Sequence, residues 1–181
     1  MFAVSSSLPA ARVASVAGLA LAIRILVGAG IVWLIVQTVG HRDPLWAMIS
    51  VVIVSDVQLD ATVIAFRGRA VNTLIGCAVG LAFLYILGPA SWSILLAMSV
   101  AVLASTYSVQ TITAWRIAPV TVALVMTPSF MHGSLHAGTA VAITRVVEVL
   151  IGSAVAVLVA LIFALVARAR RYASAQALSR R

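Results

Sequence analysis

The sequence predicts an all-α, polytopic membrane protein with six transmembrane helices. Only 9% of its 181 residues are charged and 64% are hydrophobic, with a mean hydropathy of +1.19, whereas a soluble domain carries roughly 25% charged residues. The apolar residues form runs close to the roughly 20 residues that one span requires. These runs fill nearly the whole chain, so we expect a membrane domain over residues 1–167 and a basic cytoplasmic tail over 168–181.

Short polar or turn-forming clusters separate the apolar runs. They read HRDP at 41–44, FRGR at 66–69, GPAS at 88–91, QTITAWR at 110–116 and HGSLHAG at 132–138. Proline and glycine within or near these clusters favour helix starts and stops. We therefore expect spans over 16–39, 45–66, 70–87, 92–109, 117–131 and 138–167.

The distribution of arginine predicts the orientation of these spans. All twelve basic residues are Arg, and cytoplasmic loops of membrane proteins are enriched in basic residues. With the N-terminus inside, only Arg42 lies in an outer connector, joined by Arg145 if that residue reaches the interface. The inner side holds nine: Arg12, Arg67, Arg69, Arg116, Arg168, Arg170, Arg171, Arg180 and Arg181. We expect both termini in the cytoplasm. The absence of Lys beside abundant Ala and Val indicates a GC-rich genome, and we expect a bacterial inner membrane.

The chemistry-bearing residues exclude several classes of protein. The charges lie between apolar runs, so orientation explains the net charge of +8 better than nucleic-acid binding does. Cys77 is the only cysteine, and His132 and His136 flank a glycine-rich turn, so neither a disulfide nor a metal site is expected. No nucleophile–base pair is visible. The sequence therefore predicts no enzyme, no catalytic residues, no metal and no cofactor.

Two segments of the chain repeat each other without gaps. RAVNTLIGCAVG at 69–80 aligns with RVVEVLIGSAVA at 145–156, which pairs Arg69 with Arg145 and Gly76 with Gly152. Three spans separate the copies, so the second copy is reversed in the membrane. We expect two inverted three-helix repeats, about 16–88 and 92–167, an architecture that places transporter sites between its halves. Shared composition of two apolar helices is the alternative explanation.

Ionisable side chains inside spans are costly and mark candidate sites. Arg145 and Glu148 lie three residues apart on one helix face, either as an ion pair at the interface or as an anion-attracting and proton-exchanging pair. Asp56 and Asp60, with Gln58 between them, form either a wet helix end or a distorted segment lining a cavity.

Two further arginines lie near the ends of spans. Arg24 and Arg69 could extend to the cytoplasmic interface, which is the favoured interpretation for Arg24. Arg69 fits that interpretation less well, because its repeat partner lies on the opposite side of the membrane. The pattern Gly76-x-x-x-Gly80 favours close helix packing.

These residues resemble the fusaric acid resistance protein-like family, which overlaps the aromatic acid exporter family. One stretch runs from Arg24 through HRDPLWAMISVVIVSDVQLDATVIAFRGRAVNTLIGCAVG, and the other is WRIAPVTVALVM followed by RVVEVLIGSAVAVLV. The residues at the matching places are Arg24, Pro44, Trp46, Gln58, Arg69, Thr73, Gly76, Gly80, Arg145, Glu148 and Gly152. The likeness covers about residues 20–165. The chain departs from the family at Leu59-Asp60, where a proline often follows the glutamine, and in having no large domain or second unit after the first.

The resemblance implies export of small aromatic or other weak organic acids, driven by the proton gradient. Arg69 and Arg145 would then attract the substrate carboxylate, with Trp46 stacking on the ring and Gln58 in the polar break. Glu148, Asp56 or Asp60 would exchange the proton. A lone six-helix unit is expected to form a homo-oligomer in contact with membrane lipid. A non-transporting scaffold or regulatory subunit is the main alternative, and a passive anion channel is a third.

Overall fold

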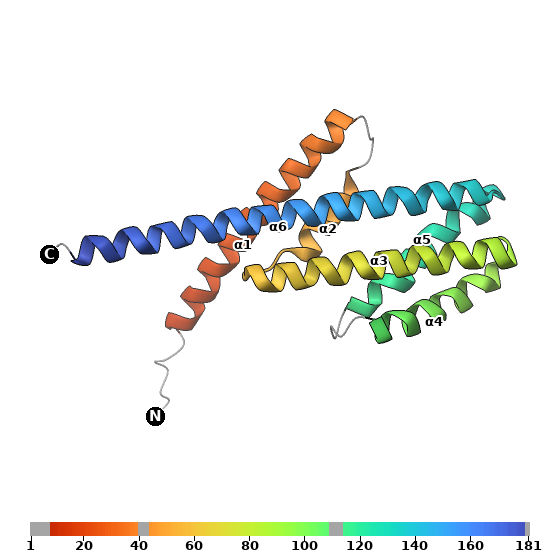
Figure 1. The fold of residues 1–181 in the computed structure, drawn as a ribbon, viewed down its shortest axis with the longest axis horizontal. Coiled ribbons are helices and arrows are strands. Elements are labelled where there is room, and N and C mark those ends of the chain that lie inside the picture. Colours follow the sequence, from red (N-terminus) through yellow and green to blue (C-terminus); the bar gives the residue numbers. More distant parts are fainter. Residues whose placement is uncertain (1–7, 40–43, 109–113, 180–181) are drawn as a thin grey trace, which may run out of the picture.

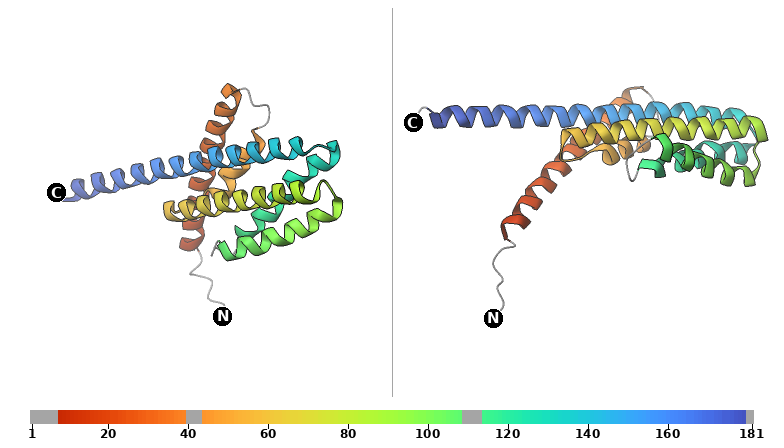
Figure 2. Two further views of the ribbon diagram at one scale, coloured as in Figure 1. Left: turned by 45° about the vertical axis from the view of Figure 1, so that its right-hand side comes forward. Right: turned by 60° about the horizontal axis from the view of Figure 1, so that its bottom comes forward.

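The computed structural model describes residues 8–39, 44–108 and 114–179, which form six α-helices and one 3-10 turn, with no strand among them. The elements are α1 (Leu8–Val39), α2 (Leu45–Val54), α3 (Leu59–Leu87), α4 (Ser91–Ser108), η1 (Ala114–Arg116), α5 (Ile117–His132) and α6 (Leu135–Ser179). The expected all-α fold is confirmed. The long helices α3 and α6 lie side by side and run in opposite directions, and the C-terminal part of α6 projects beyond the other helices (Figure 1, Figure 2).

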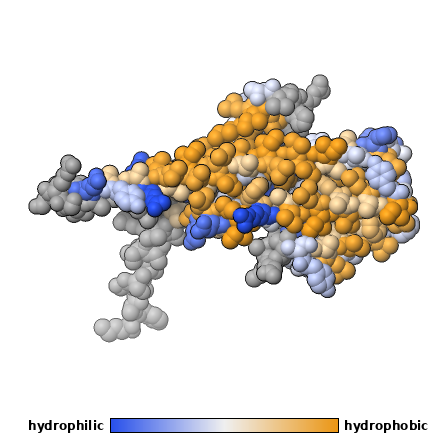
Figure 3. Space-filling model, in the orientation of Figure 1, coloured by the Kyte–Doolittle hydropathy of each residue, from blue (hydrophilic) through white to orange (hydrophobic). Residues whose placement is uncertain are grey.

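Four of the helices are long and apolar enough to cross a membrane. These spans are Ala17–Thr38, Leu59–Leu87, Ser91–Ser108 and Leu135–Arg170, while α2 and α5 are shorter apolar helices. Apolar residues cover most of the face shown in Figure 3, and large side chains such as Leu26 and Leu95 are 73% and 69% exposed. A surface of this kind is stable only in lipid, so the chain is a multi-pass membrane protein.

The boundary between the second and third spans differs from the sequence-based expectation. Helix α3 continues without interruption through 66–69, and the chain instead turns at 55–58. Arginine is a good helix former, so Arg67 and Arg69 do not end a helix as Pro or repeated Gly would. Gly68 is buried, and its carbonyl accepts a hydrogen bond from the Asn72 side chain at 2.8 Å.

The turn at 55–58 is held by polar contacts from two directions. The Asp56 carboxylate accepts a hydrogen bond from the backbone N–H of Gln58 at 3.1 Å. From α1, Arg24 donates to the backbone carbonyls of Asp56 and Val57 at 2.9 and 2.8 Å, and its guanidinium lies 5.4 Å from the Phe163 ring centre. The favoured interpretation of Arg24 was therefore incomplete, since this residue ties α1 to the turn between α2 and α3.

The buried apolar residues of the described chain form two clusters. One joins α3, α4, α5 and α6 around Leu84, Val122 and Met126. The other joins α1, α2 and α6 around Val32 and Val51.

The two three-helix halves pack by the same scheme. Helix α2 packs against α6, as α5 packs against α3. A Cβ added at Gly152 would collide with the backbone of Ala47 and with Ser50. One added at Gly76 would collide with the backbone of Ala118 and with Thr121, in each case closer than 3 Å. The α2 and α5 residues in these contacts stand 71 positions apart in both pairs. This correspondence supports the inverted repeat, which stays a prediction.

Candidate functional site

A cavity of about 230 Å³ lies where the two halves meet, between α2, α3, α5 and α6. Three residues singled out in the sequence line it: Trp46, Arg69 and Arg145. The remaining lining residues are mostly aliphatic: Ile49, Ile53, Thr73, Arg116, Ile117, Val120, Thr121, Leu124 and Val149.

The cavity wall is built from matched positions of the two halves. Trp46, Ile49 and Ile53 on α2 stand opposite Ile117, Val120 and Leu124 on α5, again 71 positions apart. Arg69 and Thr73 on α3 correspond to Arg145 and Val149 on α6 at the repeat spacing of 76. The predicted inverted repeat would place this cavity between its two halves, where transporters of that architecture hold their substrates.

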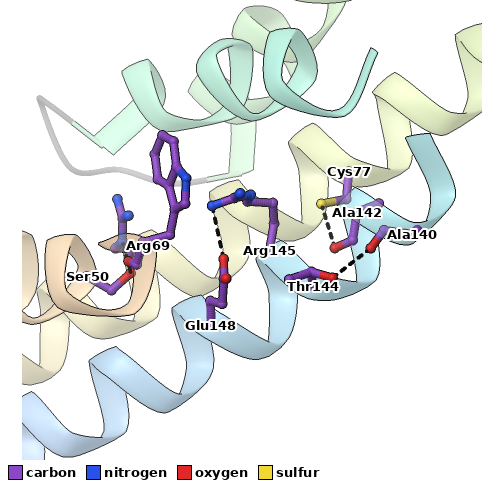
Figure 4. Close-up of polar contacts among 9 residues, drawn as sticks. Ser50, Arg69, Cys77, Ala140, Ala142, Thr144, Arg145 and Glu148 are labelled. Atoms are coloured by element: carbon purple, nitrogen blue, oxygen red, sulfur yellow. Dashed lines mark hydrogen bonds and ion pairs between the residues drawn. The ribbon is translucent and has the colours of Figure 1, made fainter. Parts of the chain in front are cut away.

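Arg69 is buried without an acidic partner. Its side chain is 6% exposed, and its Nε donates a hydrogen bond to the Ser50 hydroxyl at 3.1 Å (Figure 4). Among the described residues, no carboxylate lies within ion-pairing distance of it. A buried guanidinium is costly unless a counter-charge compensates it, so an anion bound beside Arg69 would lower this cost.

Arg145 is held on two sides. Its Nη1 lies 2.9 Å from a Glu148 carboxylate oxygen (Figure 4), and its guanidinium lies 4.4 Å from the Trp46 ring centre. The Arg145 and Glu148 side chains are only 17% and 7% exposed. The ion pair is therefore largely buried, and its role in attracting an anion and exchanging a proton stays a prediction.

Two lining residues were not recognised as site residues from the sequence. Thr73 is 2% exposed, and its hydroxyl has no hydrogen-bond partner within the part of the chain that the structure describes. Arg116 lies at the rim, exposed to solvent, with its guanidinium 5.5 Å from the Trp115 ring centre. The repeat alignment pairs Thr73 with Val149 and could have indicated Thr73. In the sequence, Arg116 counted only toward the positive charges that predict the orientation in the membrane.

The other three predicted site residues lie elsewhere. Asp56 and Gln58 are exposed at the turn between α2 and α3, Asp60 is exposed in the first turn of α3, and none of them lines the cavity. The structure does not bring them together with Arg69, and their role in proton exchange stays a prediction.

The chemistry of the cavity suits a small anion with an apolar body. An apolar cavity of about 150 Å³ holds a benzene ring, so this one accommodates a ring with an acidic substituent. Guanidinium groups bind carboxylates by two parallel hydrogen bonds. Within the described residues, no group of three or more His, Cys, Asp or Glu side chains could hold a metal ion.

A family model described as fusaric acid resistance protein-like matches residues 31–159. That range includes every residue that lines the cavity. Comparisons with curated proteins and with solved structures gave no significant match.

Proposed function

Because the chain belongs to the fusaric acid resistance protein-like family, whose members are membrane transporters and not enzymes, we propose that it exports small aromatic or other weak organic acids. The substrate leaves as an anion through the cavity between α2, α3, α5 and α6. An inside-negative membrane potential favours the exit of one negative charge by about 2.3 kcal/mol per 100 mV. Exchange for an incoming proton adds the proton gradient to this driving force.

The observation that supports this proposal most strongly is the environment of Arg69. It is a buried cation that faces a cavity and has no acidic partner among the described residues. A substrate carboxylate supplies the missing charge, and the buried Thr73 hydroxyl is available for a further hydrogen bond. The apolar walls from α2 and α5 cover the ring.

Glu148 is the residue proposed to exchange the proton. It is buried, whereas Asp56 and Asp60 are exposed. A proton on Glu148 removes the charge that holds Arg145 in place, so protonation changes the cavity directly. Proton coupling therefore acts through the Arg145–Glu148 pair.

The proposed setting is a bacterial inner membrane with both termini in the cytoplasm. The matched halves would let the cavity open to either side in turn, as inverted repeats do in other transporters. The expectation that two copies associate stays a prediction, which the mass of the purified protein in detergent would test.

The test compares two arginines that lie two residues apart on α3. Arg69 is buried at the cavity, whereas Arg67 is exposed and outside it. In cells loaded with labelled benzoate, we expect Arg69→Gln to slow efflux about tenfold or more, because hydrogen bonds to charged groups contribute ~1.5–3 kcal/mol. Arg67→Gln, which removes the same charge, should leave efflux close to that of the unmodified protein. Membrane insertion is checked for each variant.

Other outcomes would favour other functions. No efflux across a panel of aromatic acids, with the protein inserted, would favour the scaffold or regulatory subunit. Efflux that persists with an uncoupler, together with electrical conductance, would indicate a passive anion channel. Equal losses for Arg67→Gln and Arg69→Gln would contradict the cavity as the binding site.

A further inference from the structure

The buried charges around the cavity do not balance. Arg69 and Arg145 are cations, and Glu148 is the one buried carboxylate of the described residues that lies in contact with either of them. Glu148 neutralises Arg145 across a 2.9 Å ion pair. One positive charge, that of Arg69, is left without compensation.

The remaining charged groups of the surrounding helices do not change this balance. Arg24 on α1 binds the carbonyls of the turn at 55–58 and lies outside the cavity lining. Arg67 on α3 is exposed. Arg116 also lines the cavity but is exposed, so it is not one of the buried charges. No described residue of α2, α4 or α5 adds Asp, Glu, Lys or Arg to the cavity wall.

We propose that Glu148 determines the charge of the substrate that the cavity accepts. Because Glu148 neutralises Arg145, the buried positive charge that remains is that of Arg69. One monoanionic aromatic carboxylate neutralises this charge, whereas a dianion brings one negative charge too many. This inference rests on the proposed function, since it assumes that the cavity binds organic anions. Glu148 acts through Arg145 and does not itself line the cavity. It is therefore a specificity-determining residue that positions and neutralises a neighbour.

A dianion is excluded by electrostatics and not by size. Its first carboxylate pairs with Arg69. Its second would compete with the Glu148 carboxylate for the Arg145 guanidinium, which brings two like charges together inside the protein. Benzoate and terephthalate have the same ring and differ by one carboxylate, so a comparison of their affinities changes the charge while the ring stays the same. Near neutral pH both are fully ionised.

The experiment measures the affinities of purified, full-length protein for benzoate and terephthalate by calorimetry in detergent. The unmodified protein should bind benzoate about tenfold more tightly than terephthalate. Glu148→Gln, which keeps the shape and removes the charge, leaves two buried cations and should reverse this preference. Glu148→Asp keeps the charge and should retain the preference for benzoate.

A double variant distinguishes charge from a merely structural role. Arg145→Gln together with Glu148→Gln removes both members of the pair, so Arg69 again supplies a single buried positive charge. This variant should prefer benzoate although Glu148 is gone. It also tests the proposal if Glu148→Gln alone does not fold, because it contains no unpaired Arg145.

Each result either supports or overturns the inference. A preference for benzoate in Glu148→Gln equal to that of the unmodified protein would overturn it, as would a preference for terephthalate in the double variant. Failure of the unmodified protein to bind either acid would instead contradict the proposed function. Binding of benzoate by the unmodified protein, with no change of preference in any variant, would leave the exporter intact and remove only the role of Glu148.

Discussion

Arg24, Arg69 and Arg145 lie within apolar helices, and each has a different partner. Arg24 donates to backbone carbonyls of the turn at 55–58, and Arg145 pairs with Glu148. Among the described residues, the hydrogen-bond partner of Arg69 is the neutral Ser50 hydroxyl. A cation inside a membrane protein is rare and usually compensated by another group. The partner of each arginine therefore distinguishes one that stabilises the fold, such as Arg24, from one that is suited to bind an anionic ligand, such as Arg69.

Arg24 is expected to act through structure. In Arg24→Met, two charge-assisted hydrogen bonds to Asp56 and Val57 are lost, and we expect the protein to be destabilised by about 2 kcal/mol or more. Hydrogen exchange should become faster at the backbone amides of 55–58. Benzoate affinity should change little, since Arg24 lies outside the cavity. Unchanged exchange at the turn would show that these hydrogen bonds do not stabilise it.

The sequence identified part of the candidate site. Arg69 and Arg145 stood out because charges are costly in apolar helices, and the structure places both at one cavity with Trp46. Asp56 and Asp60 stood out for the same reason but lie exposed at a turn. A single sequence records that a charge interrupts an apolar run, but not whether that interruption ends the helix or faces its interior. Only the three-dimensional arrangement separates these cases.

At the scale of helices, close backbone contacts determine how the halves fit together. Gly76 and Gly152 each face the backbone of a short helix of the other half. The spacing of Gly76 and Gly80 predicted close helix packing, and the repeat alignment pairs Gly76 with Gly152. It did not predict the helix boundary at 55–58, because Arg67 and Arg69 resemble a polar loop although arginine favours helices. The Arg24 hydrogen bonds to the turn join residues that lie more than 30 positions apart in the sequence.

A pair of glycine substitutions tests this packing. A methyl group at position 152 would collide with Ala47 and Ser50, whereas a methyl group at position 30 has nothing within 4 Å. We expect Gly152→Ala to destabilise the protein by ~1–3 kcal/mol through overpacking. Gly30→Ala should stabilise α1 by up to ~1 kcal/mol, since Ala favours helix. Thermal unfolding in detergent measures both. An unchanged midpoint for Gly152→Ala would contradict the tight α2–α6 contact.

For the molecule as a whole, the revised helix boundaries affect the argument for orientation. Arg67 and Arg69 lie within α3 and no longer belong to an inner loop. The bias nevertheless persists, because Arg12, Arg116 and the five C-terminal arginines outweigh Arg42. Helix α6 has 45 residues, about 67 Å at 1.5 Å per residue, against a hydrocarbon thickness of about 30 Å. Its arginine-rich end therefore extends out of the bilayer.

A C-terminal fusion tests the orientation. With the C-terminus in the cytoplasm, green fluorescent protein fused after Arg181 should fluoresce, and alkaline phosphatase at the same position should be inactive. The positive charges nearest the end of α6, including the exposed Arg168 and Arg170, favour this side of the membrane. An active phosphatase fusion would reverse the assigned orientation.

The buried position of Cys77 makes this protein convenient for chemical labelling. Its thiol is 6% exposed and donates to the Ala142 carbonyl at 3.7 Å, inside the contact between α3 and α6. Thiol reagents react with accessible thiolates, so a polar maleimide should not modify the natural protein. A single cysteine introduced at Ile53 or Val120, on either wall of the cavity, would then be the only reactive position in the chain. Its rate of modification from each side of the membrane, with and without benzoate, would report the direction in which the cavity opens.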